Sequence, residues 1–123
     1  MINKLNLAWD TFDFYTEEIS GYEAEHLNNS KTLDNFLNNG NFPQKDQRKR
    51  FFKKSNKCID ILLTLYKKQM DSISDLIELN ESHDDIPPEK EIDTMSLVAL
   101  KNITATLIEE MRMHQSEIKD LLG

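Results

Sequence analysis

The sequence predicts an all-α protein, an antiparallel bundle of three long helices with a short connector helix. Apolar residues recur at helical spacing through most of the 123 residues. Only three Gly and three Pro are present, too few for the many turns of a β sandwich. The composition, 38% apolar and 30% charged, is typical of a folded helical protein. A chain of this length fits one domain, so we expect residues 1–123 to form a single helical-bundle domain.

The first helix is expected from about Ile2 to Leu27, with an aromatic-rich apolar stripe on one side. That stripe consists of Leu5, Ala8, Trp9, Phe12, Tyr15, Ile19 and Tyr22. Leu7 and Phe14 lie on the opposite side, where a three-helix bundle would leave them exposed. They are therefore candidate contact residues for the following loop or for another subunit.

The connector is expected between the first two long helices, in a segment rich in turn-forming residues. Ser30 is placed as an N-cap and Gly40 as a C-terminal stop. Between them, three apolar residues are spaced as one helical turn: Leu33, Phe36 and Leu37. We expect this short helix to cover one end of the core.

The central helix is expected from Pro43 to about Leu79, since proline suits the first turn of a helix. Its apolar stripe includes Phe51, Cys58, Ile59, Leu62, Tyr66, Met70, Ile73 and Leu76. A polar stretch and the Pro87–Pro88 pair end it.

The third helix is expected from about Pro88 or Asp93 to Leu122. It has a heptad seam at Leu97, Leu100, Thr104, Leu107, Met111, His114, Ile118 and Leu121. We expect the core to close around Trp9, Phe12, Tyr15, Ile59, Leu62, Tyr66, Leu100, Leu107 and Met111.

Charge is strongly segregated along the chain, although the net charge is only −7. Residues 1–40 carry two Lys against seven acids, and residues 71–123 carry four basic residues against thirteen acids. Residues 41–70 carry nine Lys and Arg against two Asp. Such a pattern governs which segments and partners attract one another more than it governs the fold.

The basic residues of the central helix form the main candidate binding site. On a helical wheel, one arc facing away from the apolar stripe holds Lys49, Arg50, Lys53, Lys54 and Lys57, and Lys68 continues it. One explanation is internal, because acids of the first and third helices would lie beside this part of the bundle. The other is an anionic partner. The strip pointing most directly outward, Arg50, Lys57 and Lys68, is the part that internal pairing would not neutralise.

Catalytic signatures are not visible in the sequence. Three Gly and one Cys leave no phosphate-binding loop and no zinc-type cysteine pair, so we expect no enzyme and no cofactor. Glu23 and His26 have the Glu-x-x-His spacing that di-iron bundles use, and Glu110 and His114 lie one turn apart on the third helix. The central helix supplies no inward carboxylates, so a metal-binding bundle enzyme is the weakest alternative, and the histidines are better explained as core fillers.

The sequence thus predicts a small protein–protein interaction protein, an adaptor, inhibitor or assembly factor, whose partner has an acidic surface. The alternative is a nucleic-acid-binding protein that uses the same basic face. The heptad seam and the Leu7–Phe14 pair predict a homodimer. A single Cys58, no signal-peptide core and no apolar run of about 18 residues favour the cytoplasm and no membrane contact.

Overall fold

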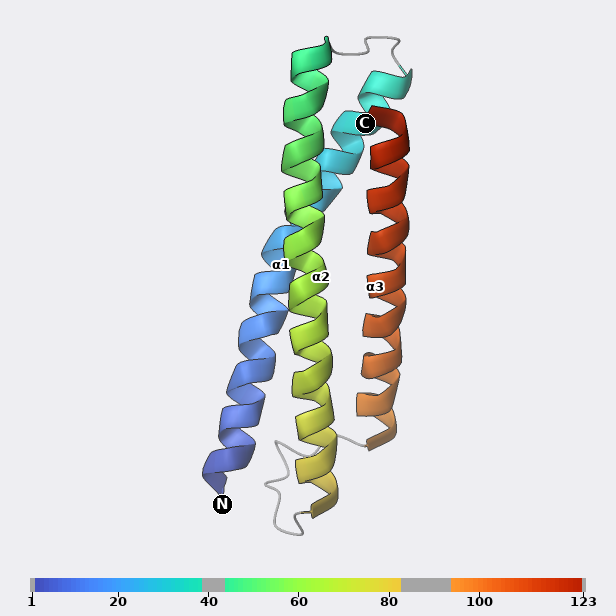
Figure 1. The fold of residues 1–123 in the computed structure, drawn as a ribbon. Helices are drawn as coiled ribbons and strands as arrows, with labels where there is room; N and C mark the ends of the chain where they lie inside the picture. The colour runs from blue at the N-terminus through green and yellow to red at the C-terminus, as the bar shows by residue number, and fades with distance from the viewer. Residues whose placement is uncertain (1, 39–43, 83–93, 123) are drawn as a thin grey trace.

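The protein is described by a computed structural model that covers residues 2–38, 44–82 and 94–122, with side-chain surroundings for 4–38, 44–80 and 94–121. These residues form three long helices, α1 (Ile2–Asn38), α2 (Lys45–Ser82) and α3 (Thr94–Leu122). Figure 1 shows α1 and α3 running in the same direction and α2 running against both. The predicted all-α class with three long helices is confirmed. None of the described helices is apolar enough over a sufficient length to cross a membrane.

The central helix holds the molecule together, because both other helices pack on it. Within the described residues, no Cα of α1 lies within 8 Å of a Cα of α3. In Figure 1, α1 crosses α2 diagonally, and its last turns approach the C-terminal end of α3. The arrangement follows from the wide apolar face of α2, which covers a partner helix on each side. The remaining arc of α2 is left facing solvent.

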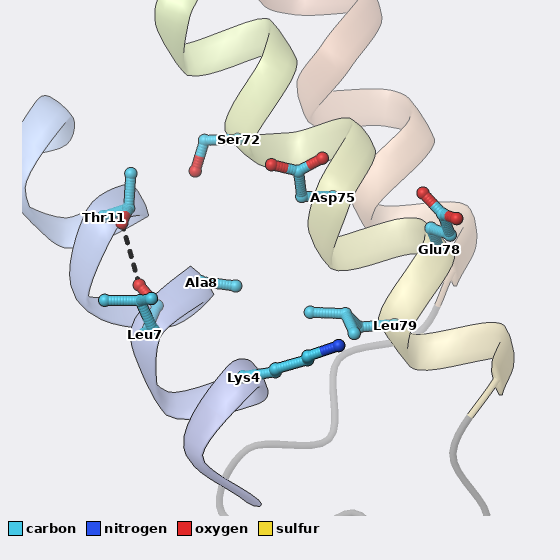
Figure 2. A pocket seen from close by; sticks show the side chains of 8 residues that line it. All are labelled: Lys4, Leu7, Ala8, Thr11, Ser72, Asp75, Glu78 and Leu79. Atoms are coloured by element: carbon cyan, nitrogen blue, oxygen red, sulfur yellow. Dashed lines mark hydrogen bonds between the residues drawn. The ribbon is translucent and has the colours of Figure 1, made fainter. Parts of the chain in front are cut away.

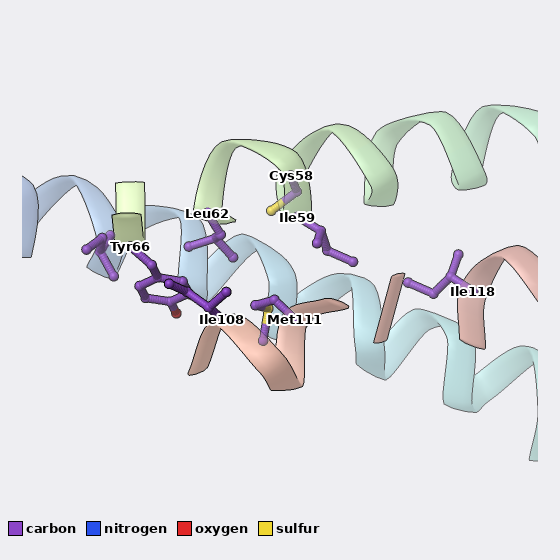
Figure 3. Close-up of a cluster of buried hydrophobic side chains, with 8 residues drawn as sticks. Cys58, Ile59, Leu62, Tyr66, Ile108, Met111 and Ile118 are labelled. Atoms are coloured by element: carbon purple, nitrogen blue, oxygen red, sulfur yellow. The ribbon is translucent and has the colours of Figure 1, made fainter. Parts of the chain in front are cut away.

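Two hydrophobic clusters make up the core. The first cluster joins all three helices and consists of Ile19, Cys58, Ile59, Leu62, Tyr66, Ile108, Met111 and Ile118, most of which Figure 3 shows. The second cluster lies where the N-terminal half of α1 meets the C-terminal half of α2, and consists of Leu5, Trp9, Ile73, Leu76 and Leu97. Ile59 and Leu62 are completely buried, so the centre of α2 is the best-packed part of the molecule.

The predicted connector helix is wrong, because residues 28–38 continue α1 without interruption. Thr32 donates its hydroxyl hydrogen to the carbonyl oxygen of Asn28 within the helix, at 3.0 Å. Leu33 packs against the first cluster. Tertiary burial therefore outweighs the weak helix propensity of the Asn-rich segment. The predicted stop at Gly40 and the predicted start at Pro43 lie outside the described residues, as does the Pro87–Pro88 pair.

The predicted seam of α3 is only half correct. Every seventh residue from Leu97 is buried, namely Leu97, Thr104, Met111 and Ile118. The alternate positions are not: Leu100 and Leu121 are 37% and 44% exposed, and Leu107 and His114 are half-buried. The expected role of Leu100 in closing the core is therefore wrong. The reason is that α1 stays too far from α3 to cover the second half of a two-partner seam.

Candidate interaction surface

The basic face predicted from the sequence lies in the N-terminal half of α2. Lys49, Arg50, Lys53, Lys54 and Lys57 are all exposed. They lie at the end of the bundle where α1 and α3 also have their C-terminal ends (Figure 1). Because α1 and α3 occupy two sides of α2, the helical period turns these side chains to the uncovered arc. The surface that consists of these five residues is called the basic face below.

Internal neutralisation of the basic face is not found among the described residues. The ion pair seen there, within 4.0 Å, joins Arg112 to Glu109 inside α3, at 3.7 Å. Lys54 of α2 and Glu25 of α1 both act on the Cys58 thiol, yet no ion pair joins the two. The sequence-based expectation that acids of α1 and α3 pair with the flanks of this face is therefore not met.

Farther along α2, the outward face changes sign. Lys68 is exposed, and it is followed by three exposed acids, Asp71, Asp75 and Glu78. Thr64, also exposed, lies between the basic and the acidic part. The charge sums over segments do not reveal that these acids share the face of the cations, whereas the charges at fixed helical positions do.

Leu7 and Phe14 are exposed as predicted, at 66% and 57%. Leu7 lines a pocket between the N-terminal part of α1 and the acidic part of α2; Lys4 lines it from α1 and Asp75 from α2 (Figure 2). Phe14 meets the ring of its neighbour Tyr15 edge-on, with ring centroids 5.5 Å apart. The structure therefore does not join these two residues to the basic face, because they lie toward the opposite end of the bundle.

A polar group lies inside the first cluster. The Tyr66 hydroxyl donates to Glu23 Oε2 at 2.8 Å, linking α2 to α1. Burial, followed by the bond to Glu23, raises the pKa of Tyr66. On the same turn of α1, the Tyr22 carbonyl accepts a hydrogen bond from the Cys58 thiol at 3.4 Å. Burial, with Glu25 adding to it, raises the pKa of that thiol to about 11, so Cys58 remains protonated and unreactive at neutral pH.

His26 and His114 come together from helices whose backbones stay apart. His26 Nε2 lies 3.2 Å from His114 Nδ1, and the two rings stack with centroids 5.3 Å apart. Burial lowers the pKa of His26, and His114 lowers it further, while Glu23 opposes both effects. A hydrogen bond between two imidazoles needs one proton between the nitrogens, so this contact is made with the pair uncharged or singly charged.

The structure brings together two histidines of the metal-site alternative, but the described residues around them do not form a complete set of metal ligands. Glu23 accepts from Tyr66 in this structure. Within the described part of the chain, no group of three or more His, Cys, Asp or Glu side chains is placed to hold a metal ion. The histidine pair is therefore best described as a partly buried polar link between α1 and α3.

Side-chain amides supply further links that periodicity alone could not identify. Gln115 of α3 donates to Asn56 and to Asp60 of α2, both at 2.7 Å. Gln69 of α2 donates to the Thr16 hydroxyl of α1 at 2.8 Å. These bonds fix the rotation of the two outer helices on α2, and so fix which arc of α2 stays uncovered.

Comparisons with known proteins give no relative: no family model, no curated protein and no solved structure matches this chain.

Proposed function

We propose that this is a non-enzymatic interaction protein that binds a partner protein with an acidic surface through the basic face of α2. Acting as an adaptor, inhibitor or assembly factor requires a binding surface and no chemistry. The observation that supports it most is that five exposed cations share one helical face with no ion pair to the described residues. Cys58, buried, protonated and free, fits a protein that works in the reducing cytoplasm.

Helix stability does not explain the basic face. The basic face begins beyond the first turn of α2, so the helix macrodipole, which acts within that turn, does not favour its cations. Like charges one turn apart, as in Lys49 with Lys53 and Lys53 with Lys57, cost ~0.2–0.5 kcal/mol per pair. An arrangement that is unfavourable in the isolated chain becomes favourable when acids of a partner approach it.

A protein partner fits this chain better than a nucleic acid does. The net charge of −7 would repel a polyanion from every other face of the molecule. An acidic protein patch is limited in extent and can match a short basic strip without meeting the acids of α1 and α3. For these reasons the nucleic-acid alternative is kept as an outcome of the test.

The proposal is tested by reversing charge on the basic face, with Lys49, Arg50, Lys53 and Lys57 changed together to Glu. A matched control reverses four cations elsewhere: Lys4, Lys31, Arg112 and Lys119. Both variants should keep the helical circular dichroism of the parent, since all eight side chains are exposed.

Tagged parent and variants are then used to capture proteins from nuclease-treated native lysate, followed by mass spectrometry. A partner should bind the parent and the control variant and be lost from the basic-face variant. Equal capture by all three chains would contradict the proposal. If the parent instead binds short duplex or single-stranded DNA, with affinity falling steeply as salt rises, the nucleic-acid function replaces it.

A further inference from the structure

We propose that the outward face of α2 binds a second copy of the same chain, with the two α2 helices antiparallel and the twofold axis beside Thr64. This inference rests on the proposed function, since it names the acidic partner of the basic face. The acidic surface is the C-terminal half of the α2 helix of the other copy.

Charges on the outward face are mirrored in sign around Thr64. Arg50 and Glu78 lie fourteen residues to either side of it, and each pair closer in is also of opposite sign. The closer pairs are Lys53 with Asp75 at eleven residues, Lys57 with Asp71 at seven, and Asp60 with Lys68 at four. All of these residues are exposed. Asp60 also accepts a hydrogen bond from Gln115 of α3, and Asp75 and Glu78 also line the pocket beside α1. When two identical helices cross antiparallel at Thr64, each cation therefore faces an acid of the other copy.

Like charges do not meet at mirrored positions along the described part of α2. The remaining cations that have a described mirror position face uncharged residues: Arg48 faces Asn80, Lys49 faces Leu79, Lys54 faces Ser74, and Lys67 faces Ile61. Repulsion between like charges is what usually excludes wrong pairings. A parallel pairing of the same faces would place Lys57 beside Lys57 and Asp71 beside Asp71, so it is disfavoured.

Spacing also suits a long helix–helix contact. Arg50, Lys57, Thr64, Asp71 and Glu78 are seven residues apart, so they form one stripe on the surface of α2. At ~1.5 Å of rise per residue, the stripe extends for about 42 Å. The same stripe therefore stays in contact with its copy over several turns, as the heptad stripes of antiparallel helices do.

Antiparallel pairing also offsets the unfavourable charge distribution within α2. In the single chain, cations gather in the N-terminal half of the helix and acids in the C-terminal half, so like charges lie one turn apart in each half. In the pair, the basic end of one helix lies beside the acidic end of the other, and the two helix dipoles oppose one another. A second copy therefore accounts for both halves of the pattern, whereas a separate acidic partner accounts only for the cations.

The contact has few apolar groups. Thr64, a polar residue, is at its centre, and the side chain of Ile61 beside it is half-buried within its own chain, so little apolar surface is left to contact the other copy. Exposed ion pairs are individually weak and are screened by salt. We expect a reversible dimer that is strengthened at low ionic strength, smaller in area than a permanent interface.

Charge exchange at one mirrored pair provides the test, using the full chain. Lys57→Glu and Asp71→Lys are made separately and together, and self-association is measured by sedimentation velocity at low and at physiological salt. Each single variant places like charges together at two symmetric contacts. We expect each to weaken the dimer roughly tenfold or more. The double variant regains opposite charges at both contacts and should dimerise like the parent.

Mixing the two single variants gives the sharpest result. In a mixed pair, the Lys57→Glu copy presents an acid at both positions of the exchange, and the Asp71→Lys copy presents a cation at both. Every contact between the two copies is therefore complementary. The mixture should form a heterodimer that is tighter than the homodimer of either single variant. A control variant with Lys31→Glu and Asp120→Lys, which lie on α1 and α3, should dimerise with the affinity of the parent.

Three outcomes would overturn the inference. A parent chain that stays monomeric at low salt excludes the dimer. A dimer that is unaffected by either single variant, or is lost without rescue in the mixture, shows that another surface is used. If the chain stays monomeric while the basic face still captures a different protein from lysate, the proposed function stands and only the second copy is excluded.

Discussion

The two hydrophobic clusters of this bundle are built by the same helical period but differ in what they enclose. The first cluster contains Tyr66, and its residue Ile118 lines a pocket together with the paired histidines, so titratable groups lie in it and beside it. The second cluster is formed by aliphatic side chains and Trp9, whose ring meets Phe12 edge-on at 5.6 Å. Both stabilise the fold by burying apolar surface, and the first also couples folding to proton binding, because burial raises the pKa of Tyr66 and lowers that of His26.

This difference comes from the course of α1. Its C-terminal half runs beside the C-terminal half of α3, which brings His26 to His114, whereas its N-terminal half stays with α2. Where three helices converge, the polar side chains of Tyr66 and His26 are enclosed, and each has a hydrogen-bond partner on another helix. Where two helices pair and the third contributes mainly Leu97, apolar side chains fill the space.

The largest expected effect is loss of stability from a cavity in either cluster. Leu62→Ala truncates a side chain of the first cluster that is 0% exposed, and Leu76→Ala truncates one of the second cluster that is 1% exposed. Each should lower the free energy of unfolding by about 3 kcal/mol, measured by urea denaturation. A cost below about 1 kcal/mol for one of them would show that its cluster can collapse and is not part of the rigid core.

A smaller effect is expected from Tyr66→Phe, which removes the hydroxyl that donates to Glu23. Glu23 is exposed and can be hydrated in the variant, so the loss should be about 1 kcal/mol. Because the pKa of Tyr66 is raised in the folded chain, the unfolded chain loses its proton first as pH rises above 10.0. Stability should therefore fall at alkaline pH in the parent, and this fall should be shallower in Tyr66→Phe, as urea titrations at several pH values would show.

Lowering the pH should decrease the free energy of unfolding through protonation of His26. Its pKa is lowered by burial in the folded chain, so below pH 6.5 the unfolded chain binds more protons and the free energy of unfolding decreases. His26→Gln should reduce this dependence between pH 7 and pH 5. Leu76→Ala, a change in apolar packing of the second cluster, should leave the slope of the parent intact. Equal slopes in the parent and His26→Gln would show that His26 does not carry the pH dependence.

The smallest effect on stability is expected at Leu7 and Phe14. Both are more than half exposed, so Leu7→Ser and Phe14→Ser should change the free energy of unfolding by less than about 0.5 kcal/mol. If either residue contributes to a partner surface, its variant should weaken capture while keeping the parent melting temperature. A destabilisation of more than about 1 kcal/mol would mean that the side chain packs in solution, which would remove it from the candidate surface.

The all-α class and the buried face of α2 could be predicted from the sequence. Residues such as Ile59, Leu62 and Tyr66 recur at the helical period, and burial of one continuous stripe requires a helix there. The outward direction of the basic face followed from the same period, because residues opposite a buried stripe must face solvent. By contrast, the end of α1 was mispredicted, since local turn propensity in the Asn-rich segment is weaker than the burial of Leu33.

Only the tertiary structure decided which residues meet across the helices. The hydrogen bond from Tyr66 to Glu23 and the contact of His26 with His114 join positions 43 and 88 residues apart, which no local spacing records. The half-exposed seam of α3 likewise depends on the course of α1, not on the heptad itself. Periodicity determines which face of a helix is apolar, whereas the crossing of neighbouring helices determines how much of that face is covered.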